Sequence, residues 1–419
     1  MVLKKSMAKT VKPARRGKAA QTELSILKLI QSSPSISRVE LAQASGLSTA
    51  AITGVVSSLV QKNILIEGPS LAGGLGRKRV GLMLRQTLGY VVGVDLGTFN
   101  LRVTISDLNG VSLASHETPT QMDRGRDQVL RHTCRLIRET LREAGIKPGQ
   151  VLGIGVAFSG VIDVEKGIIL SYPRPGHVES WRNIPLRKIF EDEFHVPCLL
   201  EDSVRAIAIS ERTNGAGRKY SDFVYIDVGV GIGSAIFIHG KIYRGFNGSA
   251  GEFGHMTVDE DGPLCCCGNH GCLEAIASGA TLIDMVKGAL KKGVPSKLLE
   301  IAGGSDKITL EAIAEAAEAN DSLAFRSLTE VAGHIGTACA DLINLLNPEA
   351  IIFGGAMFRA APELLIRQVQ QLVRRRAMEK SVNDAVLLTA TTKSDAGAHG
   401  IAKLIAERVL DEVMERNLI

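Results

Sequence analysis

Four of the chain's seven cysteines lie within residues 265–272, and a histidine stands ten residues before the first of them. Three thiolates and one imidazole satisfy the four-coordinate, tetrahedral preference of a structural Zn2+. The sequence therefore predicts a zinc site with the ligands His255, Cys265, Cys267 and Cys272. Gly268 and Gly271 allow sharp turns between these ligands, and Cys266 is expected to point away from the metal. The alternative, a set of buried free thiols, fits this spacing less well.

Length, composition and charge restrict the classes of protein that remain. The chain has 419 residues, of which 45% are hydrophobic, and this length corresponds to roughly two to four domains. No apolar run reaches the roughly 18 residues of a membrane span, and the N-terminal lysines precede no apolar signal core. We therefore expect a cytoplasmic, soluble protein without membrane insertion.

The charge is distributed unevenly along the chain. Residues 1–85 contain 14 Lys and Arg against 3 Asp and Glu, a net charge of +11, whereas the remainder contains 35 against 41, a net charge of −6. The N-terminal part therefore suits a polyanion such as DNA.

The basic part of the chain has the pattern of a DNA-binding domain. Residues 1–20 are rich in Lys and Arg and poor in apolar side chains, so we expect a disordered tail. The predicted elements after it are a helix closed by Pro34, a helix at 38–45 capped by Ser37, a helix from the Ser48 cap to about Gln61, and strands at 64–67 and 80–84 around a basic loop at 73–79. This order predicts a winged helix-turn-helix domain over residues 21–86, whose third helix would enter the major groove.

The predicted DNA contacts are of two kinds. Small and polar side chains at the exposed face of the third helix suit base edges, and basic side chains of the loop suit phosphates or the minor groove. The candidate contacts are Arg38, Ser48, Thr49, Ala50, Thr53, Ser57, Arg77, Lys78 and Arg79. A three-helix packing module without nucleic acid is the alternative, but the net charge of +11 favours DNA binding.

From Tyr90 onward, apolar strands alternate with amphipathic helices. Two passages, residues 90–107 and 223–239, each consist of a buried strand, a glycine turn and a second strand, as if one unit were used twice. Duplicated α/β lobes with a cleft between them would follow. The glycine turns can offer backbone N–H groups to phosphates, although they serve equally well as hairpin turns.

Together these motifs resemble the ROK family of repressors and sugar kinases. The matching motifs are the winged helix, the strand that ends Asp95-Leu96-Gly97, the loop Gly229-Val230-Gly231-Ile232-Gly233, the run Glu252-Phe253-Gly254-His255, and the Cys-x-Cys-Gly-x-x-Gly-Cys-x-Glu signature that ends at Glu274. The resemblance covers residues 21 to about 410, and the winged helix places the chain with the repressor branch.

The resemblance implies an α/β, actin-like fold of the hexokinase (ASKHA) type behind the winged-helix domain, with zinc in the second lobe. The implied boundaries are a tail at 1–20, the DNA-binding domain at 21–86, a first lobe at 87–205 with 395–419, and a second lobe at 206–394.

The resemblance also implies a sugar pocket beside the metal. In the family, the histidine of the Glu-x-Gly-His motif binds zinc and touches the sugar, while the two motif glutamates accept hydrogen bonds from sugar hydroxyls. The sugar-binding candidates are Asp202, Glu252, His255 and Glu274. For Glu252 and Glu274 the alternative is surface or structural hydrogen bonding.

Departures from the kinase motifs predict that phosphoryl transfer is lost. Family kinases carry Glu-Asn-Asp, with the Asp as general base, where this chain has Glu201-Asp202-Ser203. Ser203 lacks useful basicity, so the rate of phosphoryl transfer should lose the contribution of base catalysis, which is roughly 100- to 10,000-fold. Asp202 could replace the base only in a shifted register. The vestigial nucleotide-binding candidates are Asp95, Gly97, Gly229, Gly231, Gly233, Gly354 and Gly355. Phe99 could fill the γ-phosphate space, so we expect weak or no ATP binding.

The leading hypothesis is a sugar-responsive transcriptional repressor of carbohydrate genes that binds operator DNA as a homodimer or homotetramer. The rival hypotheses are an active ATP-dependent sugar kinase with an appended DNA-binding domain, and a repressor controlled by a protein partner. Asp202 and Arg174 hint at a sugar that carries an amine or an acidic group.

Overall fold

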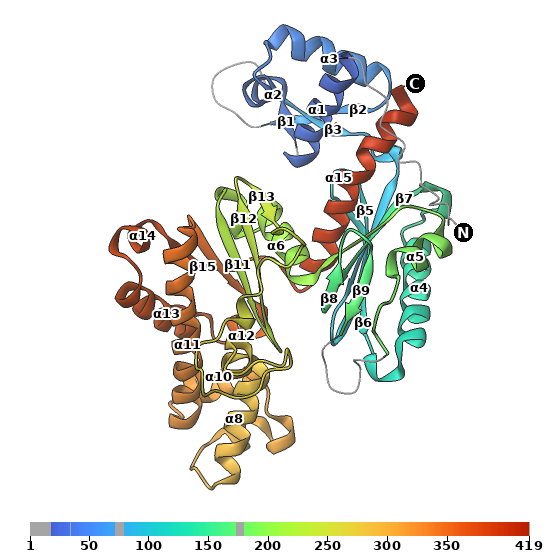
Figure 1. Ribbon diagram of the computed structural model, residues 1–419. Helices are drawn as coiled ribbons and strands as arrows, with labels where there is room; N and C mark the ends of the chain where they lie inside the picture. Colours follow the sequence, from blue (N-terminus) through green and yellow to red (C-terminus); the bar gives the residue numbers. More distant parts are fainter. Residues whose placement is uncertain (1–17, 34, 72–78, 173–179, 419) are drawn as a thin grey trace, which may run out of the picture. The chain divides into compact units, whose positions relative to one another are not determined.

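The computed structural model describes residues 18–33, 35–71, 79–172 and 180–418. The chain divides into two compact units (Figure 1). Residues 1–89 and 407–419 form the first, here called the N-terminal unit, and residues 90–406 form the second, the large unit. Residues 407–419, which we expected in the first lobe, thus share their contacts with residues 1–89.

The N-terminal unit contains three helices and a small sheet in the predicted order. Its elements are α1 (Lys18–Ser32), β1 (Ile36–Ser37), α2 (Arg38–Ser45), α3 (Thr49–Gln61), β2 (Leu65–Leu71) and β3 (Arg79–Leu84), and the strands lie in the order β1-β3-β2. Ser37 and Glu40 form a capping box at the start of α2, Gly46 ends this helix at φ 70°, and the Ser48 hydroxyl caps α3. The local capping signals therefore predicted α2 and α3 correctly.

Apolar side chains from all three helices form the core of this unit. Ile26, Leu41 and Ile52 are fully buried. The largely buried Glu23 of α1 accepts hydrogen bonds from Ser58 of α3 and from Lys62, at 3.1 and 3.0 Å. This ion pair fixes α1 against the end of α3.

The large unit contains two sheets with the same topology. The first lobe has β4 (Tyr90–Leu96), β5 (Asn100–Asp107), β6 (Ser112–Pro119), β7 (Val151–Phe158) and β10 (Cys198–Asp202) in the order β10-β7-β4-β5-β6. The second lobe has β11 (Phe223–Val228), β12 (Ile232–Ile238), β13 (Lys241–Tyr243), β14 (Ala350–Gly354) and β15 (Val386–Thr389) in the order β13-β12-β11-β14-β15. In each lobe an antiparallel three-strand meander continues into two parallel strands. The prediction of a duplicated unit is confirmed.

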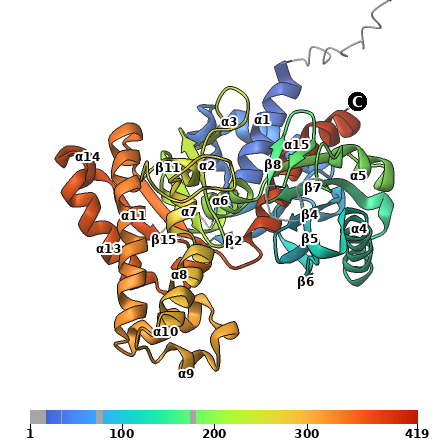
Figure 2. The same ribbon diagram turned by 60° about the horizontal axis from the view of Figure 1, so that its bottom comes forward.

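Helices cover the two sheets. In the first lobe these are α4 (Arg126–Glu143) and α5 (Leu186–Phe194), with a hairpin of β8 (Val161–Asp163) and β9 (Ile168–Ser171), followed by α6 (Ser203–Asn214). In the second lobe they are α7 (Leu273–Ala277), α8 (Gly279–Lys291), α9 (Leu298–Ala302), α10 (Leu310–Glu318), α11 (Ser322–Leu346), α12 (Gly355–Ala360), α13 (Pro362–Arg376) and α14 (Glu379–Asp384). Figure 2 shows α8, α9 and α10 at the edge of this lobe.

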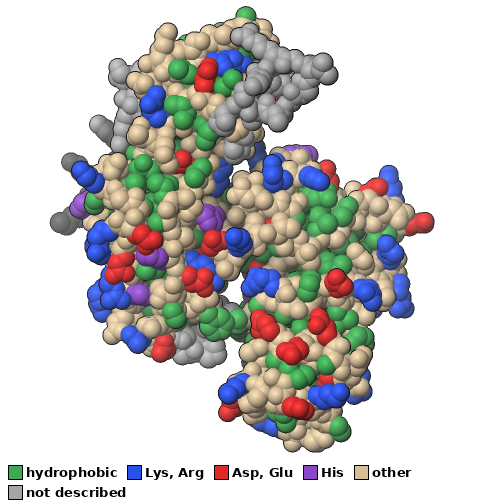
Figure 3. Space-filling model, turned by 180° about the vertical axis from the view of Figure 1, so that it is seen from behind, with side chains coloured by type: hydrophobic (Ala, Val, Ile, Leu, Met, Phe, Trp, Pro, Cys, Tyr) green, Lys and Arg blue, Asp and Glu red, His purple; other side chains and the backbone are tan. Residues whose placement is uncertain are grey.

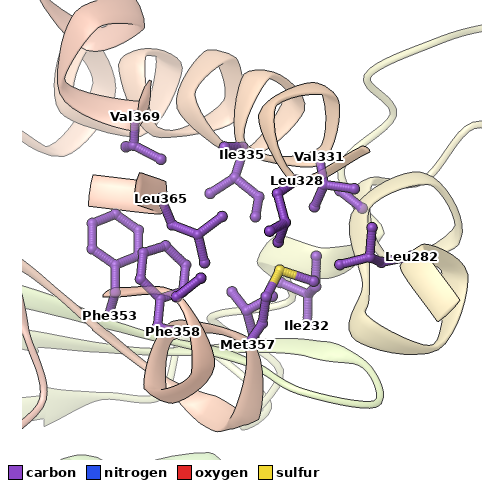
Figure 4. Packing of buried hydrophobic residues seen from close by; sticks show 14 of the residues in the cluster. Ile232, Leu282, Leu328, Val331, Ile335, Phe353, Met357, Phe358, Leu365 and Val369 are labelled. Atoms are coloured by element: carbon purple, nitrogen blue, oxygen red, sulfur yellow. The ribbon is translucent and has the colours of Figure 1, made fainter. Parts of the chain in front are cut away.

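The larger core lies between the second sheet and helices α11 to α13. Figure 4 shows Phe353, Met357 and Phe358 facing Ile335 and Leu365, and the rings of Phe353 and Phe358 stack with centroids 4.5 Å apart. Burial of each such side chain contributes roughly 1.5–3 kcal/mol. This core holds the loops that carry the predicted ligands.

The last helix, α15 (Ala396–Leu418), contributes residues to both units. It lies directly on the first-lobe sheet, because a Cβ at Gly93 would collide with the carbonyl oxygen of Ala398. A Cβ at Gly155 would likewise lie 2.7 Å from the Ile401 carbonyl oxygen. Within the described residues, no helix is sufficiently long and apolar to span a membrane.

Candidate functional site

The four predicted metal ligands lie together in the second lobe. Their donor atoms all fall within 4.8 Å of one another. The Sγ atoms of Cys267 and Cys272 are 3.7 Å apart, and Cys265 Sγ is 3.6 Å from His255 Nδ1. A tetrahedron with metal–sulfur bonds of roughly 2.3 Å has edges of roughly 3.8 Å, so the donor set and its spacing fit Zn2+.

The backbone around this cluster explains how a short loop brings the four donors together. Cys265 donates its N–H to the Asn269 carbonyl at 2.7 Å, and Gly268 donates to the Cys265 carbonyl at 2.9 Å. Gly271 has a φ of 65°, and a Cβ there would collide with the Asp259 carbonyl oxygen. Cys266 is exposed and is not one of the four; its thiol lies 3.4 Å from a Glu274 oxygen and within 4.8 Å of the Cys265 thiol.

The predicted sugar-binding side chains come from three parts of the fold: Asp202 at the start of α6, Glu252 and His255 at the turn 252–255, and Glu274 in α7. Asp202 caps α6 by accepting the Arg205 N–H at 3.0 Å. Burial raises the pKa of Asp202 to about 6, and the neighbouring carboxylates of Glu201 and Glu252 raise it as well. His255 turns Nδ1 toward the thiols, and its Nε2 lies 4.0 Å from Glu252.

Glu274 has a different environment from the other three. One carboxylate oxygen accepts the Ile232 N–H at 2.8 Å, and the other is next to the Cys266 thiol. This side chain therefore joins the cysteine loop to the glycine loop between β11 and β12.

Ser203, at the predicted base position, contacts a second hydroxyl and a carboxylate. Ser203 is 6% exposed, its hydroxyl accepts a hydrogen bond from Ser159 at 3.0 Å, and it lies 3.5 Å from Asp95. Burial raises the pKa of Asp95 to about 6, although the adjacent Arg102 lowers it. The structure thus places a serine pair next to a buried carboxyl at the predicted base position.

A cavity of about 400 Å3 lies beside Ser203 between the lobes. Five of the predicted nucleotide-binding residues line it, namely Asp95, Gly97, Gly229, Gly354 and Gly355, whereas Gly231 and Gly233 are not among its lining residues. Phe99, which was expected to fill the γ-phosphate space, also lines the cavity and is 64% exposed.

The predicted DNA contacts on α3 form an exposed face. Ser48, Thr49, Ala50, Thr53 and Ser57 are all exposed, while Ile52 and Val56 are buried on the opposite side. Arg38 is half-buried, and its guanidinium forms an ion pair with Glu67 at 2.7 Å. Arg77 and Lys78 lie outside the described residues, as does the side chain of Arg79.

Sequence reasoning missed a buried ion network beside Asp202. Glu201 is 0% exposed and pairs with both Arg205 and Arg244. Glu201 and Arg205 are four residues apart, and this spacing could have suggested an i, i+4 ion pair. No sequence signal connects either residue to Arg244.

Comparisons with known proteins agree with this architecture. Residues 91–408 match the ROK family, and residues 20–66 match a winged helix-turn-helix DNA-binding domain. This chain belongs to the ROK family. Among ROK relatives, a xylose repressor from Caldicellulosiruptor bescii is 30% identical over 85% of this chain and 88% of its own length. The DNA-binding transcriptional dual regulator NagC of Escherichia coli is 28% identical over 94% of each chain.

Two solved ROK structures cover different shares of this chain. A ROK transcriptional regulator described as a homologue of the E. coli MLC protein aligns over 96% of this chain and 98% of its own, with a TM-score of 0.78 and 26% identity. A ROK glucokinase from Streptomyces griseus, in complex with glucose and AMPPNP, aligns over 75% of this chain and 99% of its own, with a TM-score of 0.64 and 30% identity. The actin-like two-lobe fold behind a winged helix is therefore confirmed.

Proposed function

We propose that this protein is a sugar-responsive transcriptional repressor. The observation that carries the proposal is the extent of similarity, since regulators match both units whereas the glucokinase matches 75% of the chain. The N-terminal unit would bind operator DNA through the exposed face of α3 and its predicted wing. A sugar bound near Asp202, Glu252 and His255 would then favour one arrangement of the lobes over another.

In this proposal Zn2+ braces the pocket. His255, Cys265, Cys267 and Cys272 would hold the ion, and a bound ion fixes the orientation of the His255 ring through Nδ1. The Nε2 atom beside Glu252 then remains available for a sugar hydroxyl. Glu274 of α7 supports the pocket through the hydrogen bond that its carboxylate accepts from the Ile232 N–H of the glycine loop.

The names of two kinds of relative, xylose repressors and N-acetylglucosamine repressors, indicate the first ligands to test. Electrophoretic mobility shifts on DNA upstream of the protein's own gene are expected to show binding that weakens steeply with salt. D-xylose or N-acetylglucosamine, or a phosphorylated form of either, is expected to change the affinity for that DNA. Binding that does not depend on salt, or no binding to any fragment of this DNA, would contradict the proposal.

A second candidate function is an active sugar kinase, and the open cavity of about 400 Å3 beside Ser203 favours it. The predicted loss of the general base argues against it. A coupled-enzyme assay with Mg-ATP and a panel of hexoses, pentoses and amino sugars distinguishes the two. Turnover near 1 per second or faster, an ordinary enzyme rate, would establish the kinase.

We further propose that the protein acts as a homodimer or homotetramer, because paired half-sites of operators are read by symmetric proteins. Light scattering coupled to gel filtration measures this directly. A monomer that binds the operator with full affinity would contradict this part of the proposal.

A further inference from the structure

A buried ion network connects the two lobes next to the predicted ligand residues. Glu201 is the residue before the last in the first-lobe strand β10, and its carboxylate accepts hydrogen bonds from Arg205 Nη1 at 3.4 Å and from Arg244 Nε at 3.1 Å. Arg205 lies in α6, and Arg244 follows β13, the edge strand of the second sheet. A carboxylate of one lobe is thus paired with a guanidinium of the other.

The same network holds a loop of the second lobe. Residues 244–252 run from the end of β13 to Glu252, and we call them the pocket loop. Arg205 Nη2 donates to the carbonyl oxygens of Gly248 at 2.5 Å and Ala250 at 2.9 Å. Arg205 therefore contacts both the pocket loop and Glu201, and Arg244, the first residue of the loop, contacts Glu201 as well.

Burial makes two charges of the network costly to leave unpaired. Glu201 is 0% exposed and Arg205 is 5% exposed, whereas the Arg244 side chain is 36% exposed. Loss of Arg205 would leave two loop carbonyls without a donor, and loss of Arg244 would leave Glu201 with one cation. A buried ion pair contributes little net stability compared with well-packed apolar residues of similar volume, so the effect expected of this network is on the position of the loop.

The network sets the positions of two predicted ligand residues. Asp202 follows Glu201 and donates its backbone N–H to a Glu201 carboxylate oxygen at 3.0 Å. Glu252 ends the pocket loop that Arg205 holds. Asp202 and Glu252 come from different lobes, so their separation depends on the contacts that fix the loop to β10 and α6.

We propose that Glu201, Arg205 and Arg244 are positioning residues that order the pocket loop in the ligand-free protein and thereby hold Glu252 next to Asp202 for ligand binding. This inference rests on the proposed sugar-sensing function of the same site. A pre-ordered loop does not have to be ordered by the ligand, which increases affinity. The network accordingly sets ligand affinity without touching the ligand.

Hydrogen exchange of the full-length, ligand-free protein tests the first half of this proposal. Amide exchange in residues 245–255 is expected to accelerate at least about tenfold in Glu201→Gln and Arg205→Met, while exchange in β11 stays as in the parent. Glu193→Gln is the matched control, because it removes an exposed carboxylate that pairs with Arg138 in the first lobe. Unchanged exchange in the pocket loop, or equal acceleration throughout the large unit, would overturn the proposal.

Calorimetric titration at 25 °C tests the second half, with D-xylose, N-acetylglucosamine and their phosphates as probes. Glu201→Gln and Arg244→Met are expected to weaken binding at least about tenfold without loss of bound zinc, and Arg244→Lys, which keeps the charge, is expected to restore part of it. Faster loop exchange with unchanged affinity would reduce the network to a structural role and overturn the proposal. If the parent binds none of the probes, the sugar-sensing function fails for this panel, and the exchange data alone decide whether the network orders the loop.

Discussion

Single side chains decide whether the second lobe can hold a metal ion. Cys272 is fully buried within the donor cluster, whereas Cys266, six positions earlier, is exposed and turned toward Glu274. Chemically identical residues in one loop therefore have different expected roles. The pair provides an internally controlled test of the proposed zinc site.

Cys272→Ser is expected to lower bound zinc from about one ion per chain to well below half, because a hydroxyl is a far weaker zinc ligand than a thiolate. Cys266→Ser should retain the metal. Elemental analysis after dialysis measures the content, and thermal unfolding reports the accompanying loss of stability. Equal zinc content in both variants would exclude Cys272 as a ligand.

The pKa of Asp202 makes stability depend on pH. Burial raises this pKa from 3.8 to about 6, so the folded protein binds an additional proton between these values. The wild type therefore loses stability as pH rises from about 4 to above 6, by on the order of 2–3 kcal/mol. Asp202→Asn keeps the α6 cap but carries no charge. We expect this variant to melt at a higher temperature than wild type at pH 8 and at the same temperature near pH 4, as measured by calorimetry.

The bounds of a helix could be predicted from the sequence where its capping residues are local. Ser37, Gly46 and Ser48 fixed the ends of α2 and α3, because a cap depends on residues within one turn. The two strand–glycine–strand passages of the large unit were likewise visible in its apolar and glycine patterns, whereas the order of the strands in the two sheets was not. Contacts between distant elements were not, since the Glu201–Arg244 pair joins residues that only the packed sheets bring together.

The exposed face of α3 makes a direct prediction about operator binding. Thr53→Glu places a negative charge on the face expected to approach DNA, and we expect affinity to fall at least about tenfold. Gln21→Glu changes the charge equally at an exposed position of α1 and is the matched control. Mobility shifts at constant salt measure both. Equal affinities for the two variants would remove α3 from the interface.

The close contact between α15 and β4 predicts that a side chain at Gly93 destabilises the large unit. Gly93→Ala would push a methyl group into the Ala398 carbonyl, so the helix must move away from the sheet. We expect a loss of roughly 1–3 kcal/mol in the free energy of unfolding. Gly149→Ala, where a Cβ meets nothing within 4 Å, should change stability little. Urea denaturation distinguishes the two variants.

The two units differ in how charged residues are distributed. The basic residues concentrate in residues 1–85, while Figure 3 shows acidic and basic side chains interspersed over the visible face of the large unit. Composition therefore predicted which part would bind DNA. Composition gave no indication that residues 407–419 belong with the N-terminal unit, because that assignment depends on the tertiary contacts of α15.

Residues 407–412 are expected to support DNA binding by the N-terminal unit. Val409 and Leu410 are buried there, and Asp411 forms an ion pair with Lys28 of α1 at 2.9 Å. A chain that stops after residue 406 should lose operator affinity and unfold its N-terminal unit at a lower temperature, whereas a chain that stops after residue 412 should retain both. Ligand and zinc binding by the large unit should survive in either chain. Normal operator binding by the shorter chain would contradict this prediction.

The division of the N-terminal unit between residues 1–89 and 407–419 has a consequence during synthesis. Domains generally fold as units while the ribosome is still extending the chain, beginning with the part made first. Here residues 407–412, which bury Val409 and Leu410, emerge only after the large unit has been made. A chain that terminates before them is therefore expected to carry an incomplete N-terminal unit, so fragments that lack the complete large unit should occupy operators poorly.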